Sequence, residues 1–149
     1  GDVVILLDAD LDIPPQQIGY MLRFINRADI VITDKWHKES RVDARLIRRM
    51  LSRIFNLYVK LFTGLNLSDT QTGAKAFKRI VLEKSLRYVA TRRYCFDVEL
   101  LLVAKKLGFN IVSIPSISVI KLRSSFKVRD AFMMLLDLLF ITFRHRILH

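Results

Sequence analysis

The chain has 149 residues, of which 52% are hydrophobic, so it is long enough for one domain with a substantial core. Its 25 Lys and Arg residues outnumber its 14 Asp and Glu residues, and the net charge of +11 favours an anionic partner: nucleic acid, phospholipid or a phosphorylated substrate. The single cysteine, Cys95, excludes an internal disulfide framework and fits a reducing compartment.

The first predicted element is a strand over residues 3–7, where five apolar side chains follow one another. A run without polar alternation predicts a strand that is buried on both faces, as in a parallel sheet covered by helices. Such a strand needs neighbours, and we expect chain upstream of Gly1 to supply some of them.

Helices and strands alternate along the rest of the chain, which predicts an α/β layer fold. The longest predicted helix is amphipathic, with an apolar stripe that runs from Ile47 to Leu61 and arginines on another side. Gly64 and Gly108 stand where glycine commonly ends a helix. In chain order we expect helices over residues 14–25, 42–62, 80–86, 96–107 and 130–143, and strands over residues 30–33, 74–77, 111–114 and 117–120.

Three carboxylates, Asp8, Asp10 and Asp12, occupy every second position directly after the first strand. Ligands of open α/β sheets bind beyond the carboxyl ends of the strands, and carboxylate oxygens there suit a hard divalent cation that also bridges to phosphates. The alternative is that these acids cap the following helix. Three acids in one loop would repel one another without a cation, and this favours the metal site.

Three segments then resemble one protein family. Residues 4–15, VILLDADLDIPP, resemble the metal-binding segment of family 2 glycosyltransferases, in particular of the polyprenyl-phosphate (dolichyl-phosphate) hexosyltransferases. Residues 69–79, DTQTGAKAFKR, are similar to a second segment of that group, and residues 94–101, YCFDVELL, to a third. An isolated Asp-x-Asp is weak evidence, whereas three matches in the family's order and spacing are specific.

The resemblance implies a truncated GT-A fold: Rossmann-like α/β, with a mostly parallel sheet and flanking helices. Residues 1–129 would be the C-terminal portion of a GT-A catalytic domain, and residues 130–149 an amphipathic interfacial helix that associates with a membrane or docks. The implied reaction is the inverting transfer of a hexose, glucose or mannose, from a UDP- or GDP-sugar to a polyprenyl or dolichyl phosphate.

The resemblance also implies roles for single residues. Asp8 and Asp10 would hold Mg²⁺ or Mn²⁺, with Asp12 as a third ligand, although relatives often carry Gln at that position. Asp69 and Gln71 would line the sugar or acceptor pocket and form the catalytic set with Asp10. For Asp69 an Asx turn is the alternative.

Substrate contacts are implied elsewhere in the chain. Lys35 stands where relatives often have a diphosphate-binding arginine, and lysine keeps the charge but loses the bidentate geometry. Arg48 and Arg49 match a basic pair in relatives, with a solvated helix face as the alternative, and Lys127 lies in a segment that resembles the acceptor loop. The expected substrate-binding residues are Lys35, Arg48, Arg49, Asp97, Glu99, Ser125 and Lys127.

The C-terminal segment combines basic and apolar residues. Residues 130–143 are almost all apolar, yet shorter than the about twenty residues that span a bilayer. This suits an interfacial helix over anionic headgroups at the cytoplasmic face of a membrane, and a helix packed on the sheet is the alternative. The basic residues that flank the segment are Lys121, Arg123, Lys127, Arg129, Arg144, His145 and Arg146.

Two other functions remain open at this point. A family 2 glycosyltransferase with a glycan or another lipid as acceptor would share the motifs, although the basic, apolar C-terminal segment argues against a soluble glycan. A nucleic-acid-binding module would explain the net charge, but no nucleic-acid motif is present and the acidic loop would repel phosphate without a cation. We therefore expect no nucleic acid partner.

Overall fold

The computed structural model describes residues 1–9, 12–40, 42–43, 46–92, 94–116, 120–121 and 128–147. Helices and strands alternate within these residues, and the predicted α/β class is confirmed. The strands are β1 (Val3–Leu7), β2 (Ile30–Asp34), β3 (Val42–Asp43), β4 (Ala74–Lys78), β5 (Ile111–Pro115) and β6 (Ile120–Lys121). The helices are α1 (Gln17–Phe24), α2 (Leu46–Thr63), α3 (Arg79–Ser85), α4 (Phe96–Lys106) and α5 (Val128–Ile147), with a 3-10 helix, η1 (Leu86–Tyr88), after α3.

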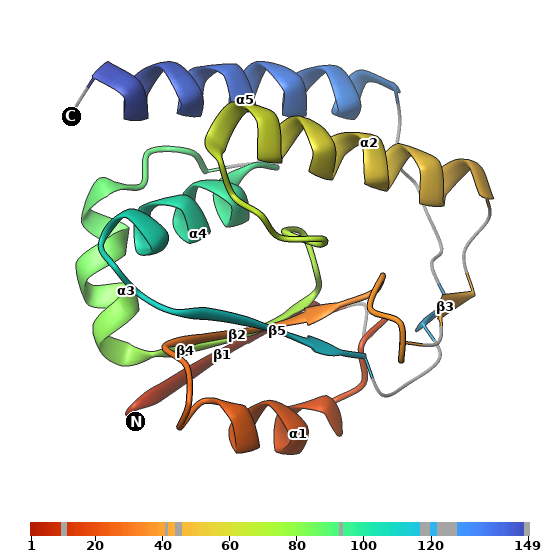
Figure 1. The fold of residues 1–149 in the computed structure, drawn as a ribbon, viewed down its shortest axis with the longest axis vertical. Helices are drawn as coiled ribbons and strands as arrows, with labels where there is room; N and C mark the ends of the chain where they lie inside the picture. Colours follow the sequence, from red (N-terminus) through yellow and green to blue (C-terminus); the bar gives the residue numbers. More distant parts are fainter. Residues whose placement is uncertain are drawn as a thin grey trace.

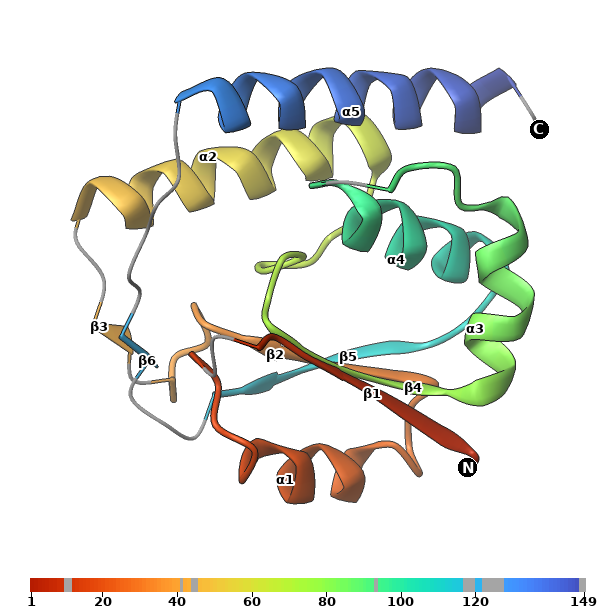
Figure 2. The ribbon, with the colours of Figure 1, turned by 180° about the vertical axis from the view of Figure 1, so that it is seen from behind.

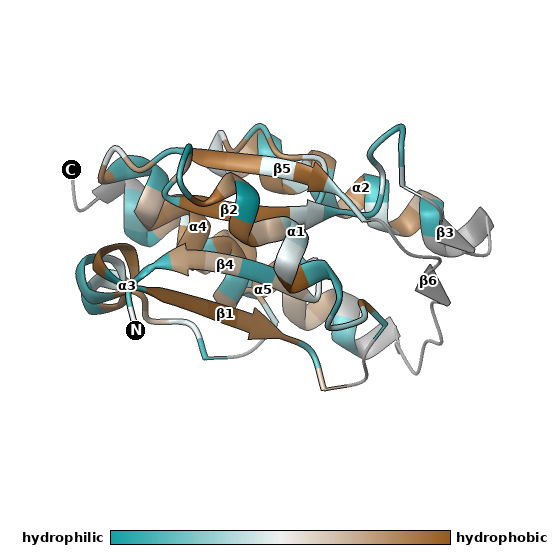
Figure 3. Ribbon diagram, turned by 90° about the horizontal axis from the view of Figure 1, so that it is seen from below, coloured by the Kyte–Doolittle hydropathy of each residue, from teal (hydrophilic) through white to brown (hydrophobic). Residues whose placement is uncertain are grey.

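A four-stranded sheet in the order β1-β4-β2-β5 forms the middle layer (Figure 3). The expectation of a mostly parallel sheet was wrong: β4 runs antiparallel to both β1 and β2, and β2 and β5 are parallel. The reason lies in the connection between β2 and β4. The chain leaves the sheet where β2 ends, passes through α2, and returns at the same edge to begin β4. A strand that enters at the edge where its neighbour leaves must run in the opposite direction.

β1 is a strand, as predicted, but it is not buried on both faces. Among the described strands, β1 pairs with β4 alone and has no strand on its other side. Leu6 is therefore exposed, and the other residues of β1 are only half-buried. A second, two-stranded sheet joins β3 to β6 in parallel and lies apart from the main one (Figure 1). The predicted strand over residues 117–120 falls mostly outside the described residues.

The core lies on both faces of the main sheet, because successive side chains of a strand point to opposite sides. Val31 of β2 packs with Met21 of α1 on one face. Ile30 and Ile32 face the other side and pack with Phe77, under α4, α2 and α5 (Figure 2). Buried side chains of all three helices belong to this second cluster, including Val59, Val98, Leu101, Leu138 and Ile141.

α4 is the most deeply buried of the described helices, with every residue from Val98 to Ala104 buried. It lies between the sheet and α5, which explains why its residues 100–104 are apolar without interruption (Figure 1). The predicted helix ends at Gly64 and Gly108 are confirmed, since both glycines adopt positive φ angles, 74° and 87°.

α5 covers residues 130–143, and its two faces differ in burial. One face of the helix, with Met134, Leu138 and Ile141, is buried in the core, as expected for a helix that packs on the protein. The opposite face, with Phe132 and Phe143, is exposed. No helix in the described part of the chain is long and apolar enough to cross a membrane.

This packing predicts that α5 contributes to the free energy of unfolding through its inner face alone. Ile141→Ala should reduce it by about 2–5 kcal/mol, because a buried side chain is lost and a cavity remains. Phe132→Ser, on the outer face, should change it by less than about 0.5 kcal/mol. Urea unfolding followed by circular dichroism measures both, and equal losses would show that α5 does not pack as described.

Candidate active site

Four segments meet at one edge of the main sheet. Asp8 follows β1, Asp34 ends β2 and Ser116 follows β5, so three strands present their carboxyl ends there. Because β4 is antiparallel to its neighbours, the loop before it, residues 69–73, lies at the same edge. This is the edge at which open α/β sheets bind their ligands.

Asp8 approaches the backbone of Gly73 closely. The Asp8 amide donates a hydrogen bond to the Gly73 carbonyl at 2.8 Å. A Cβ atom at position 73 would lie 2.7 Å from Oδ2 of Asp8, which is closer than real Cβ contacts permit. The glycine of the second motif therefore makes room for the exposed carboxylate of the first.

Two buried carboxylates lie deeper in the site. Asp69 is only 1% exposed, and its Oδ2 lies 3.5 Å from Nζ of Lys35 and 3.4 Å from the backbone nitrogen of the same residue. Asp34 accepts hydrogen bonds from the Trp36 amide, at 2.7 Å, and from the Ser68 hydroxyl. Each buried acid is thus held by donors from a neighbouring loop, as buried carboxylates require.

Asp69 holds its proton more firmly than an ordinary aspartate. Burial raises the pKa of Asp69, the Lys35 ammonium lowers it, the Asp34 carboxylate raises it, and the net shift is upward. Asp69 Oδ1 also accepts the Gln71 amide at 3.2 Å, which is the Asx turn that the sequence left as an alternative. The turn and the ion pair with Lys35 coexist, so the turn does not remove Asp69 from the site.

The loop over residues 69–73 is anchored on three sides. Gln71 donates from its side-chain amide to the Tyr94 carbonyl at 2.8 Å. Thr70 donates through its amide and its hydroxyl to Oδ1 of Asn56 on α2, at 3.3 and 3.1 Å. The Thr72 hydroxyl is hydrogen bonded to the Thr33 hydroxyl at the end of β2.

Lys75 is a buried cation behind this loop. It is 3% exposed, and its ammonium group donates to the Thr72 carbonyl and to Oδ2 of Asp97, the latter at 3.0 Å. Asp97 lies in the first turn of α4, where an acid also complements the helix dipole. The sequence predicts that Asp97 contacts substrate. In the structure Asp97 forms an ion pair with Lys75, and this pair connects α4 to the loop.

Glu99, another expected substrate contact, is fully buried and bound to protein groups. Its Oε2 accepts the Ala90 and Thr91 amides at 2.9 and 2.7 Å, and the Thr91 hydroxyl as well. Its Oε1 accepts a hydrogen bond from Nη1 of Arg144 and is hydrogen bonded to Nε2 of His145, both at 2.9 Å. With both oxygens engaged, the geometry favours a structural role that fastens α5 to α4.

The expected metal ligands are described only in part. Asp8 is exposed at the strand end, and Asp12 is half-buried beyond it, while Asp10 lies outside the described residues. Within the part of the chain that is described, no group of three His, Cys, Asp or Glu residues is placed to hold a metal ion. An exposed carboxylate at this sheet edge, backed by the Gly73 backbone, nevertheless fits a hard cation by its chemistry.

The structure describes only some of the remaining residues that were predicted to contact substrate. Arg49 on α2 is exposed and lies over the Trp36 ring, 5.8 Å from its centroid, so it borders the site through a cation–π contact. Arg48 belongs to the same helix, but its side chain is not described. Ser125 and Lys127 lie outside the described residues.

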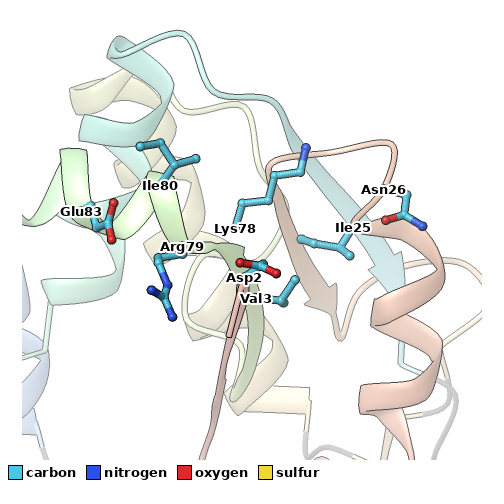
Figure 4. Close-up of a pocket in the computed structure, with 8 residues that line it drawn as sticks. All are labelled: Asp2, Val3, Ile25, Asn26, Lys78, Arg79, Ile80 and Glu83. Carbon is cyan, nitrogen blue, oxygen red and sulfur yellow. The ribbon is translucent and has the colours of Figure 1, made fainter.

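A cavity of about 440 Å³ lies at the opposite end of the sheet (Figure 4). It is lined by Asp2 and Val3 at the start of β1, by Lys78 at the end of β4, and by residues of α3 and the chain after α1. Its shape is that of an open surface hollow, and none of the predicted site residues that the structure describes lines it.

The sequence interpretation missed two charged site residues, Asp34 and Lys75. Asp34 ends a buried strand in the same way as Asp8, so the strand-end rule applied to Asp8 could have found it. Lys75 interrupts an apolar strand, and a lysine in such a place is rarely buried without a partner. The partner, Asp97, lies 22 residues away in sequence, and only the fold brings it close.

The sequence of residues 1–86 matches the family described as Glycosyl transferase family 2. The chain belongs to glycosyl transferase family 2. The Asp8 loop, β2, α2 and the Asp69 loop of this family 2 chain all lie within the matched residues.

Several curated relatives are similar to this family 2 chain. It is 30% identical to an undecaprenyl-phosphate mannosyltransferase of Micrococcus luteus over 76% of the chain and 48% of the relative. It is 31% identical to a polyprenol monophosphomannose synthase of Mycolicibacterium smegmatis over 76% of the chain and 44% of the relative. Over 99% of its length it is 27% identical to a dolichyl-phosphate beta-glucosyltransferase of Trichomonas vaginalis, covering 47% of that relative. The chain thus spans about half the length of these relatives.

The Glu99 cluster predicts an acid-sensitive fold. Burial raises the pKa of Glu99, but the hydrogen bonds from Thr91, His145 and Ala90 outweigh it and hold the pKa below its ordinary value. Glu99→Gln should therefore reduce the free energy of unfolding by about 3–5 kcal/mol at neutral pH, because buried donors lose their acceptor. The advantage of the wild type should be full above the unfolded pKa of about 4.3 and should disappear as the pH falls through the lower folded pKa.

Glu83→Gln is the matched control, since Glu83 is an exposed residue of α3. Urea unfolding of both variants between pH 3 and 7 measures the difference, with the pH range set by the carboxylate pKa of about 4.3 in peptides. A loss in Glu99→Gln no larger than in Glu83→Gln would contradict the assigned structural role.

Proposed function

We propose that the protein transfers a hexose from a nucleoside-diphosphate sugar to a polyprenyl phosphate. The observation that carries this proposal is that an exposed carboxylate, Asp8, and the buried Asp69–Lys35 pair lie at the same edge of the sheet, joined by the loop whose Gly73 contacts Asp8. The relatives support it, because all three names state a polyprenol-type lipid phosphate or its sugar product. The chain would supply the cation site and the acceptor side of a longer enzyme.

Asp8 and Asp10, with Asp12, would hold Mg²⁺ or Mn²⁺. The cation, when bound, would neutralise the charge that develops on the leaving nucleoside diphosphate. Asp8 is suited to this task because its carboxylate is exposed and lies against the Gly73 backbone. Arg49, which borders the site over Trp36, is a second cation within reach of anionic substrate groups.

The acceptor would enter beside the loop that carries Asp69 and Gln71. In the proposed step a phosphate oxygen of the lipid forms a bond to the anomeric carbon while the bond from that carbon to the diphosphate oxygen breaks. The attacking oxygen is already anionic, so no proton has to be removed. Attack from the face opposite the leaving group inverts the configuration at the anomeric carbon, and Lys35 offers a positive charge to the incoming phosphate.

The donor belongs to the UDP- or GDP-hexoses. Two of the relatives are named for mannose and one for glucose, so both sugars belong in the test. Since the acceptor is a membrane lipid, the proposed location is a membrane surface on its cytoplasmic face.

The first experiment removes the proposed cation ligand. Asp8→Asn in the full-length protein should lower the transfer of labelled hexose from UDP- or GDP-sugars into polyprenyl phosphate by about 100-fold or more, because an electrostatic contact to the developing charge is lost. Asp2→Asn, at the opposite end of β1, is the control and should retain activity. Asp12→Gln should be mild, since relatives often carry Gln there. Near-wild-type turnover of Asp8→Asn at saturating Mn²⁺ would refute the role of Asp8.

The second experiment tests the contact between the two motifs. Gly73→Ala should displace the Asp8 carboxylate, because the new Cβ would lie 2.7 Å from its Oδ2. Binding of Mn²⁺, measured by calorimetry, should weaken roughly tenfold, as it does when groups that orient a metal ligand are changed. Gly19→Ala on α1, where no atom lies within 4 Å of the added Cβ, should leave binding unchanged. Equal Mn²⁺ affinity in the two variants would show that the position of the Asp8 carboxylate does not affect cation binding.

A further inference from the structure

The loop over residues 69–73 carries polar side chains at its first four positions, and most of them are occupied by the protein itself. Asp69, Thr70 and Thr72 are at most 1% exposed, and each is hydrogen bonded to a residue outside the loop. Gln71 differs, because it is only half-buried at the ligand-binding edge of the sheet. It is therefore the polar side chain of this loop that a substrate can reach.

The orientation of the Gln71 carboxamide follows from its contact with Tyr94. Nε2 of Gln71 donates to the Tyr94 carbonyl at 2.8 Å. A carbonyl oxygen can only accept, so the amide nitrogen must face Tyr94, and the amide oxygen, Oε1, must point away from it. Within the part of the chain that the structure describes, Oε1 has no hydrogen-bond partner. Gln71 thus offers a hydrogen-bond acceptor that the protein does not use.

The segment that orients Gln71 is itself attached to α5. The Tyr94 hydroxyl donates to Oδ1 of Asp130, in the first turn of α5, at 2.9 Å. The next residue, Cys95, donates from Sγ to the Met134 carbonyl at 3.3 Å. The acceptor is therefore held in one orientation before a ligand binds, which reduces the conformational freedom that is lost on binding.

An unused acceptor is complementary to a ligand group that donates. At neutral pH the oxygens of a diphosphate or of a lipid phosphate are acceptors, and a prenyl chain has no donor. Donors for phosphate groups come from other segments, in Lys35 and Arg49. The hydroxyl groups of a hexose can donate. Gln71 is therefore complementary to the sugar of the proposed substrates and not to their phosphates.

The proposed cation site brings the sugar close to Gln71. A cation at Asp8 would bind the diphosphate of the donor, and the hexose is bonded directly to that diphosphate. Asp8 contacts Gly73, and Gln71 precedes Gly73 by two residues, so the Cα atoms of these loop residues lie within about 7 Å of each other. The sugar and the Gln71 acceptor thus belong to the same part of the site.

We propose that the carboxamide oxygen of Gln71 accepts a hydrogen bond from one hydroxyl group of the transferred hexose and so contributes to the choice of sugar. This inference rests on the proposed function, because it requires a nucleoside-diphosphate hexose at this edge of the sheet. A site that hydrogen-bonds a substrate hydroxyl discriminates against sugars that lack this hydroxyl or direct it elsewhere. A carboxamide oxygen can also bind a cation, and the experiment separates these two roles.

The experiment measures ligand binding to the full-length protein by calorimetry in the presence of Mn²⁺, with no lipid acceptor. Gln71→Met replaces the carboxamide by an unbranched apolar side chain of similar length. Gln16→Met makes the same change at an exposed position before α1 and is the matched control. The ligands are the UDP- or GDP-hexose, the free nucleoside diphosphate, and monodeoxy forms of the donor that each lack one hydroxyl.

Gln71→Met should weaken binding of the donor about tenfold, because one hydrogen bond is lost, and should change the affinity for the free nucleoside diphosphate by less than about twofold. The wild type should bind one monodeoxy donor about tenfold more weakly than the natural donor, and Gln71→Met should not weaken binding of that monodeoxy donor further. Gln16→Met should match the wild type for every ligand.

Two results with Gln71→Met would overturn the proposal. An equal loss for the donor and for the free nucleoside diphosphate would assign the oxygen to the cation or the diphosphate. Further weakening of every monodeoxy donor would show that Gln71 contacts none of the hydroxyls. Gln71→Asn, which keeps the carboxamide but withdraws it by one methylene, is a second variant and should give the same pattern as Gln71→Met. A wild type that binds all monodeoxy donors as tightly as the natural donor would overturn the proposal without any variant.

The outcome is distinct from a failure of sugar transfer, because binding is measured without turnover. Donor binding that depends on Gln71, in a protein that transfers no hexose to polyprenyl phosphate, would support this inference and refute the proposed acceptor. A protein that transfers the hexose but binds its donor independently of Gln71 would refute this inference alone.

Discussion

The orientation of β4 governs the position of the candidate active site. β4 pairs with β1 on one side and β2 on the other, and it runs against both. The loop before β4 is thereby delivered to the edge at which β1, β2 and β5 end. If β4 were parallel to its neighbours, the Asp69 loop would lie at the far edge, beside the cavity lined by Asp2 and Lys78, and could not meet Asp8. The contact between Asp8 and Gly73 depends on this orientation.

Buried charges then hold the loops against the sheet and helices. Lys75 ties the loop to Asp97 on α4, the Lys35 ammonium faces Asp69, and Glu99 fastens α4 to α5. A buried charge is costly unless it is paired and hydrogen bonded, and each of these is. The raised pKa of Asp69 shows where the compensation is incomplete. Perturbed carboxylates of this kind gather at functional sites, which agrees with the role proposed for Asp69.

α2 joins two environments that rarely share one helix. Its inner face forms hydrogen bonds to the Asp69 loop and to Trp36, whereas its outer face carries apolar side chains into solvent. An exposed apolar surface of this extent usually marks an interaction site.

The sequence alone determined the alternation of helices and strands, the strand-end position of Asp8 and the helix ends at Gly64 and Gly108, because apolar periodicity and turn chemistry are local properties. It also carried the three motifs that indicate the family. It could not determine strand direction, which depends on where the chain re-enters the sheet after α2. Nor could it show that Lys75 meets Asp97, or that the stripe of α2 faces outward, since a periodic pattern defines a face but not its partner. Those outcomes required the tertiary structure, in which α4 occupies the core position and leaves the outer faces of α2 and α5 exposed.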